Sequence, residues 1–130
     1  MADDADFTDA FCEFLQYSVT SVDAAELLLV LLENSSQPWE LHDLLALLGS
    51  STTLSEPEAA RYIDLFEAHG LIERDGAGRI VYRPSSAEIA AHARTLARLY
   101  NERPVTLIRV IYALRDTRIK SFADAFKFRR

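Results

Sequence analysis

Apolar residues along most of the chain recur with the period of an α-helix. A first helix is predicted over residues 5–18, where the residues on one face are Phe7, Phe11, Phe14 and Leu15. Ser21 stands before an acidic first turn and predicts the N-cap of a second helix over residues 22–33. Because this second helix is apolar almost all round, we expect it at the centre of the core.

Two more helices and a β-hairpin are predicted next. Residues 39–48 place leucines at i, i+3, i+4 and i+7 and stop at a glycine. The sequence Ser-Glu-Pro-Glu from Ser55 provides an N-cap, an acidic first turn and an early proline, and Gly70 ends the helix that it opens. Two strand-like runs, 71–74 and 79–83, flank Asp-Gly-Ala-Gly and predict a hairpin.

Helical spacing returns after the hairpin and continues to the end of the sequence. Three helices are predicted there, over residues 84–100, 105–114 and 118–128. The last of them aligns Ile119, Phe122, Ala123 and Phe126. We expect the 130 residues to form a single domain with three parts: a helical extension over 1–20, a core over 21–84 and C-terminal helices over 85–130.

Three helices followed at once by a two-stranded hairpin have the layout of a winged helix-turn-helix. Residues 58–72 resemble the recognition-helix segment of bacterial winged-helix regulators: a small pair, an arginine, apolar anchors and a Gly-Leu-Ile exit into the wing. The flanking helices look like the dimer-forming extensions of the multiple-antibiotic-resistance-type (MarR-like) regulators. The resemblance covers about residues 22–83. It implies a mainly α fold, with a three-helix core, a two-stranded β-wing and flanking helices, in a homodimer.

The resemblance also implies contact with double-stranded DNA through the recognition helix and the wing. The residues expected to make that contact are Arg61, Tyr62, Arg74, Arg79 and Arg83. The phenylalanine-rich ends are expected to form the dimer, through Phe7, Phe11, Phe14, Phe122 and Phe126. Because the two ends carry opposite charge, they are expected to pack on each other, either within one chain or across a two-fold axis, unless both stripes are ordinary core.

Charge is divided sharply along the chain. The first 60 residues contain twelve acidic residues and no Lys or Arg, whereas residues 61–130 contain fourteen bases and eight acids, so that the net −6 combines −12 and +6. The predicted recognition helix therefore begins with Glu56 and Glu58, at the end that enters deepest into a DNA groove. These glutamates either stabilise the helix dipole or accept hydrogen bonds from cytosine.

Three functions are compatible with this pattern. The leading one is a DNA-binding transcriptional regulator. The alternative is a winged-helix protein-interaction module, an adaptor or anti-activator, whose acidic surface binds a basic protein partner. A third is a ligand-sensing regulator with a small-molecule pocket between the dimer helices and the winged core.

Other chemistry finds little support in the sequence. The three histidines have no metal-ligand spacing, and Cys12 stands alone among carboxylates that would raise the pKa of its thiol. Nucleophile elbows, phosphate-binding loops and dinucleotide-binding loops are absent. We expect no catalytic residues, no metal and no cofactor. The acidic start and the short longest apolar run, residues 27–32, favour a cytoplasmic protein without membrane contact.

Overall fold

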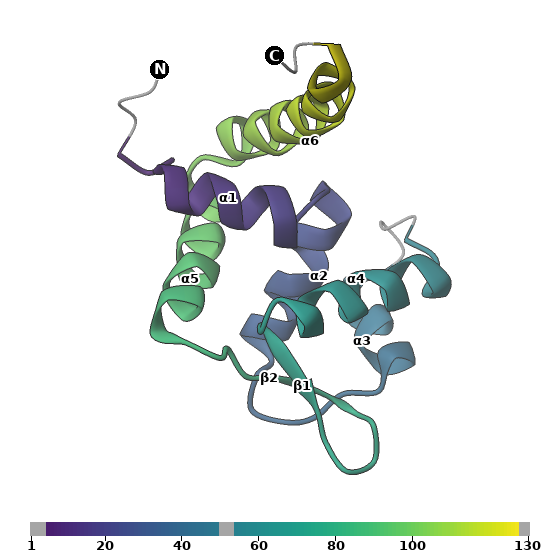
Figure 1. Ribbon diagram of the computed structural model, residues 1–130. Helices are drawn as coiled ribbons and strands as arrows, with labels where there is room; N and C mark the ends of the chain where they lie inside the picture. The colour runs from purple at the N-terminus through teal and green to yellow at the C-terminus, as the bar shows by residue number, and fades with distance from the viewer. Residues whose placement is uncertain (1–4, 50–53, 128–130) are drawn as a thin grey trace.

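The computed structural model describes residues 5–49 and 54–127, with the side chains of these ranges up to residue 116. Over these residues the fold is mainly α, with six helices and one antiparallel two-stranded hairpin between α4 and α5 (Figure 1). The elements are α1 (Asp9–Ser18), α2 (Val22–Glu33), α3 (Leu41–Leu48), α4 (Glu56–Ala68), β1 (Ile72–Arg74), β2 (Ile80–Tyr82), α5 (Ala87–Glu102) and α6 (Pro104–Lys127). The predicted order of four helices and a hairpin is confirmed.

Four helices begin at a hydroxyl side chain that accepts a hydrogen bond from a backbone N–H three residues further on. These N-caps are Thr8, Ser21, Ser55 and Ser86. Ser55 also forms the predicted capping box, in which the Glu58 carboxylate accepts from the Ser55 backbone N–H at 3.2 Å. Local sequence therefore determines where these helices start.

The helix predicted over 39–48 starts later, at Leu41, because Trp39 is used in a β-bridge. The Trp39 N–H donates to the Ile80 carbonyl at 2.8 Å, and the Ile80 N–H donates back at 2.7 Å. Trp39 thus extends the hairpin on the β2 side. A long-range backbone pairing of this kind is not visible in a helical pattern, which explains the two-residue error.

Residues 104–127 form one helix, so the prediction of separate helices over 105–114 and 118–128 is wrong. The polar run Arg-Asp-Thr-Arg at 115–118 interrupts the apolar pattern, but no glycine or proline lies between residues 105 and 127 to break the backbone. No single helix in the described part of the chain, α6 included, is both long and apolar enough to cross a membrane. The pair α1 and α2 meets that test only together, and it is bent by 99°.

The core is built around α2, as predicted. Fully buried leucines on this helix include Leu27, Leu28 and Leu31. α2 contacts α3, α4, α5 and β2, so that it lies inside the other elements. Each of these neighbours therefore needs to bury only one face, and its opposite face remains exposed to solvent.

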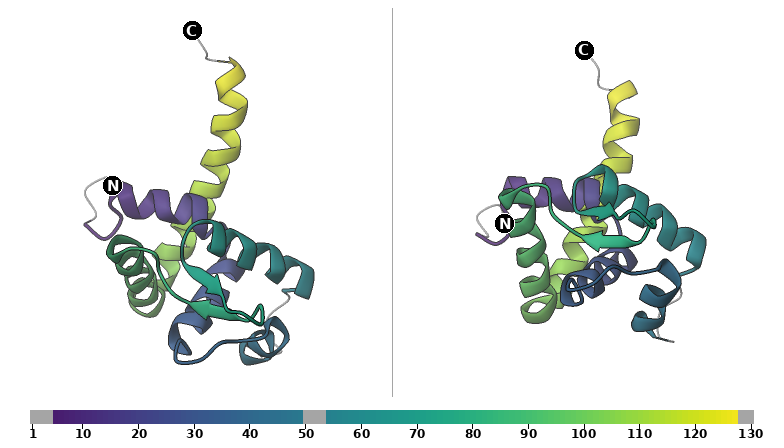
Figure 2. Two further views of the ribbon diagram at one scale, coloured as in Figure 1. Left: turned by 60° about the horizontal axis from the view of Figure 1, so that its bottom comes forward. Right: turned by 90° about the horizontal axis from the view of Figure 1, so that it is seen from below.

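The passage from α4 into the hairpin depends on Gly70. Its φ of +78° lets the Gly70 N–H donate to the Glu67 carbonyl at 3.1 Å and the Leu71 N–H donate to the Phe66 carbonyl at 2.9 Å. This pair of bonds is a Schellman motif, which closes the helix and turns the chain directly into β1. The hairpin consequently lies beside α4 (Figure 2).

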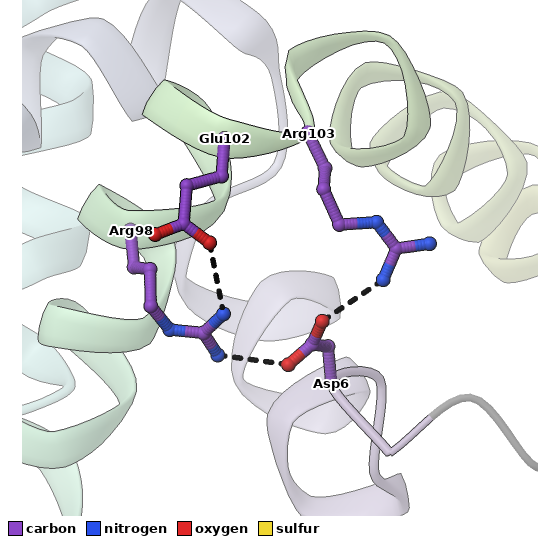
Figure 3. A network of polar contacts seen from close by, with 4 residues as sticks. All are labelled: Asp6, Arg98, Glu102 and Arg103. Carbon is purple, nitrogen blue, oxygen red and sulfur yellow. Dashed lines mark hydrogen bonds and ion pairs between the residues drawn. The ribbon is translucent and has the colours of Figure 1, made fainter.

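The N-terminal segment is fastened to the junction of α5 and α6. The Asp6 carboxylate lies 2.8 Å from the Arg98 guanidinium and 2.9 Å from that of Arg103 (Figure 3). Arg103 also stands over the ring of Phe7, 5.6 Å from its centroid. Since α1 contacts α6 as well, the N-terminal segment packs on α6 within one molecule. The side chains of Phe122 and Phe126 lie outside the described ones, so the pairing of the two phenylalanine-rich ends stays a prediction.

Replacing Gly70 with alanine is expected to destabilise the fold more than replacing Gly78. Both glycines have a positive φ, +78° and +81°, which costs an L-residue about 1–3 kcal/mol. At Gly70 a Cβ would also meet the side chain of Ser85, whereas nothing lies within 4 Å at Gly78. Urea unfolding followed by circular dichroism measures the difference. Equal losses of stability would contradict the close approach at Gly70.

Asp6→Asn is expected to weaken the fold at neutral pH and to reduce its sensitivity to acid. Hydrogen bonds from Arg98 and then Arg103 hold the pKa of Asp6 below its ordinary value. A carboxyl with a lowered folded-state pKa stabilises the fold above its unfolded pKa, and this contribution is lost as the pH falls through the folded pKa. Urea midpoints from pH 7 to about pH 2.5 should therefore vary less in Asp6→Asn than in the unmodified chain.

Asp9→Asn is the matched control for this experiment, because it removes a carboxylate from the first turn of α1, where the described residues show no ion pair with it. If both variants changed the acid dependence equally, the Asp6 contacts would not be its cause.

Candidate functional site on α4 and the hairpin

α4 buries one face and exposes the other. Ala59, Ile63 and Phe66 point into the core at helical spacing. The exposed side carries Glu56, Glu58, Arg61, Asp64 and Glu67. The hairpin lies beside α4, so the two elements that carry the five predicted DNA-contact residues are adjacent.

Arg61 projects from the middle of the exposed face. Within the described chain its guanidinium forms no ion pair, although it interacts electrostatically with Glu58. Hydrogen bonds from Ser55, and to a lesser degree the charge of Arg61, lower the pKa of Glu58. Glu58 is therefore held in the capping box, as a first-turn residue that stabilises its own helix.

Tyr62 lies on a different side of α4 from Arg61. It is half-buried, and its hydroxyl accepts a hydrogen bond from the Ser21 hydroxyl at 2.8 Å. Because Ser21 is also the N-cap of α2, this contact braces α4 against the start of the central helix. The structure thus separates Tyr62 from the arginines with which the sequence grouped it.

Arg74 joins the hairpin to α4. Its Nη2 lies 3.0 Å from Asp64, and its Nε lies 3.1 Å from Glu67. Both carboxylates are on the exposed side of α4. The two contacts hold β1 against the helix, and they partly neutralise the charge that Arg74 was expected to offer to DNA.

The other two hairpin arginines are also paired. Arg79 lies 3.0 Å from Asp75, and Arg83 lies 3.0 Å from Glu73. The arginine side chains remain 45% and 63% exposed, respectively. Ion pairs this exposed contribute about 0–1 kcal/mol, so a phosphate group that approaches can compete with the carboxylate for the arginine.

Asp75 organises the tip of the hairpin. Its Oδ1 accepts hydrogen bonds from the backbone N–H of Ala77 at 3.0 Å and of Arg79 at 2.8 Å. Its Oδ2 accepts from Arg79 Nε at 3.0 Å. These bonds, the backbone bond from Arg79 above all, lower the pKa of Asp75. The carboxylate therefore fixes both the shape of the tip and the direction of Arg79.

The surface formed by α3, α4 and the hairpin is acidic overall. Residues 40–83 contain eight acidic and four basic residues, a net charge of −4. Glu40 and Asp43 are exposed on and beside α3, and Glu56 is exposed at the start of α4. Basic side chains are thus isolated points on a negative surface.

The phenylalanines assigned to the dimer have another place in the structure. Phe11 and Phe14 are 2% and 8% exposed in the core, and Phe7 packs against it. They therefore pack within one molecule and leave little surface for a second copy. Phe122 and Phe126 lie outside the residues whose side chains the structure describes.

Two features of the surface were missed by the sequence analysis. His69 and His92, which are 23 positions apart in the sequence, line one cleft of about 300 Å³ between α1, the end of α4 and α5. A second cleft of about 420 Å³ lies behind the hairpin, where Arg74 and Arg83 meet Glu67 and Glu73. The walls of the first cleft come from segments distant in sequence, and no local pattern marks it. The second is lined by residues between 67 and 85 alone, around the hairpin.

Metal and thiol chemistry remain without positive support. Among the described residues, no three His, Cys, Asp or Glu side chains are grouped as metal ligands would be. Burial chiefly, and then the Asp9 carboxylate, raise the pKa of the Cys12 thiol, in the direction expected from the sequence. A thiol of this kind is a weak nucleophile at neutral pH.

Comparison with known proteins gives no match to a protein-family model, a curated protein or a solved structure. The resemblance to MarR-like regulators therefore rests on residues 58–72 and on the order of the elements, and it stays a prediction.

Asp75→Ala is expected to loosen the hairpin tip. The amides of Ala77 and Arg79 lose their acceptor, and a hydrogen bond worth about 1 kcal/mol corresponds to roughly fivefold faster hydrogen exchange. NMR exchange rates measure this change. Glu73→Ala, which removes only the ion pair to Arg83, should leave both amides unchanged. Unaltered exchange in Asp75→Ala would contradict the role of the carboxylate.

Proposed function

We propose that this chain is a winged helix-turn-helix transcriptional regulator that binds double-stranded DNA. The order α2, α3, α4 and hairpin supports the winged-helix assignment. So does the bridge of Trp39 to Ile80, which adds a short third segment to the sheet between α2 and α3. In this arrangement α4 is the helix that enters the major groove, and the hairpin reaches the adjacent backbone.

The observation that carries the proposal is that Arg61 on α4 and the exposed hairpin arginines belong to two elements in contact. Arg61 enters the groove, while Arg79 and Arg83 exchange their carboxylate partners for phosphates. Each phosphate contact displaces counterions from the duplex, which provides most of the affinity. Tyr62 supports α4 from its inner side.

The regulator acts as a homodimer. One copy offers few cations to a duplex, and a two-fold pair doubles them and spans half-sites about 34 Å apart. Two large apolar residues on α6, Val105 and Tyr112, are 63% and 45% exposed. The second half of α6 extends beyond the other elements (Figure 2). Because the α1 phenylalanines pack within one molecule, α6 provides most of the dimer contact.

A duplex of mixed sequence should be bound at low salt and released steeply as salt rises. Log affinity is expected to fall linearly with log salt, with a slope of about −0.9 per phosphate contacted. Arg61→Ala should weaken binding and make the slope shallower by about one per copy. Fluorescence anisotropy measures both quantities.

Arg94→Ala is the matched control for Arg61→Ala. It removes an exposed helical arginine from α5, outside α4, the hairpin and the α6 face that carries Val105 and Tyr112. Its affinity and slope should stay close to those of the unmodified chain. If the unmodified chain does not bind at about 20 mM salt, where counterion release is most favourable, the DNA-binding proposal is wrong.

A second candidate function is favoured by the charge of the same surface. The net −4 of residues 40–83 and the pairing of three arginines suit an adaptor that binds a basic protein partner. Neutralising Glu56 and Asp43 together separates the two functions. The double variant should bind DNA more tightly if the surface faces phosphates, whereas an adaptor surface should fail to bind DNA before and after the change.

A further inference from the structure

A groove of about 230 Å³ runs between α2 and α3 and is closed at one side by α5. Its lining is mainly aliphatic, with carboxylates and one phenol beside it: Leu29, Val30, Leu47, Leu48, Glu26, Glu33 and Tyr100. We call it the α2–α3 groove. Leu47 is 46% exposed there, which is unusual for a large aliphatic side chain in this molecule.

The rim of the α2–α3 groove is negative. Both helices that form it lie in the part of the chain without Lys or Arg. The Tyr100 hydroxyl donates to the Glu26 carboxylate at 2.7 Å and fixes one charge in position, while Glu33 is exposed. An aliphatic floor with an acidic rim fits an amphipathic helix that carries apolar side chains on one face and bases beside them.

The chain itself contains a segment of this chemistry. Residues 117–130 include five bases and one acid, a net charge of +4, together with Phe122, Phe126 and Phe128. The part of α6 that carries this segment extends beyond the other elements (Figure 2). At 1.5 Å per residue, the helix from 117 to 127 reaches about 16 Å beyond residue 116.

We propose that residues 117–130 of one copy pack into the α2–α3 groove of a second copy, and that the second copy returns the same contact. A reciprocal exchange of this kind closes as a two-fold dimer. It pairs the most basic part of the chain with its acidic half. The inference rests on the dimer in the proposed function, and it is independent of DNA binding.

Two other surfaces on which residues 117–130 could pack fit the segment less well. Pairing of α6 with a second α6 brings together like charges, since residues 104–130 carry a net +5. The cleft beside α1 is acidic too, but Ser18 and two histidines share its walls with Phe14, Tyr17 and Ile89, and Glu88 there lies 3.8 Å from His92. The α2–α3 groove also has two carboxylates, but its walls contain four aliphatic residues.

Disulfide trapping tests which surface the segment contacts. In a Cys12→Ser background, single-cysteine chains carry Leu47→Cys in the groove, Tyr17→Cys beside α1, or Ser121→Cys in the segment. Two cysteines bridge only when their Cα atoms approach within about 7 Å. Mixing the Leu47→Cys and Ser121→Cys chains under mild oxidation should give cross-linked dimers at least tenfold faster than the other mixtures.

Each rival arrangement predicts a different cross-linked dimer. A dominant cross-link between Tyr17→Cys and Ser121→Cys, or between two Ser121→Cys chains, would overturn the groove contact. A monomeric state of the unmodified 130-residue chain in light scattering at about 100 μM would overturn it as well.

Charge reversal provides a second, independent measurement. Glu33→Lys and Lys120→Glu should each weaken the dimer about tenfold in sedimentation equilibrium, and the double variant should recover most of that loss. Glu13→Lys is the matched control, a reversal of another exposed glutamate, beside α1, that should leave the dimer unchanged. Loss of dimer in Glu13→Lys, or no rescue in the double variant, would contradict the proposal.

The same chains distinguish failure of this inference from failure of the proposed function. Cross-linking through Leu47→Cys without binding to a duplex at low salt overturns only the DNA-binding function. Binding to the duplex by a dimer that does not cross-link through Leu47→Cys overturns only the groove contact.

Discussion

The fold depends on the burial of α2. Each leucine of this helix that is fully removed from water contributes about 1.5–3 kcal/mol, and Leu27, Leu28 and Leu31 are among them. Because α2 is apolar on nearly every side, it can hold α3, α4, α5 and β2 at once. Those elements are then free to expose charged faces, and it is on them that the candidate interface lies.

The hairpin arginines of that interface are paired with carboxylates close to them. Each hairpin arginine is paired with a carboxylate from the hairpin itself or from the adjoining helix, as with Arg74 between Asp64 and Glu67. The hairpin is therefore positioned by exposed ion pairs, each of which is weak. Affinity for a polyanion then depends on how readily a phosphate replaces a carboxylate at Arg79 and Arg83, more than on the number of arginines.

Sequence reasoning succeeded at the helix ends and turns, where the controlling interaction is local. Of its errors, the start of α3 has a long-range cause, whereas the division of α6 and the role of Tyr62 came from local patterns that were misread. The cap at Ser55 and the turn at Gly70 follow from neighbouring residues, so α4 and the hairpin were predictable. The bridge of Trp39 to Ile80 joins distant segments and was not. Tyr62 was open to prediction after all, since it lies three residues after buried Ala59 and four before buried Phe66, on the side that faces the core.

Contacts within one molecule pair only some of the charges near the two ends of the chain. Asp6 is paired with Arg98 and Arg103, and the α1 phenylalanines pack in or against the core, so that these residues of the N-terminal segment are already used within one molecule. The basic segment after residue 116 lies further along α6, beyond those contacts. Charges attract strongly only within about 8 Å at physiological salt. Long-range attraction therefore does not decide which surface the segment binds. Apolar fit decides first, and an acidic rim second. The α2–α3 groove offers both, which makes it a better match than the rest of the negative surface.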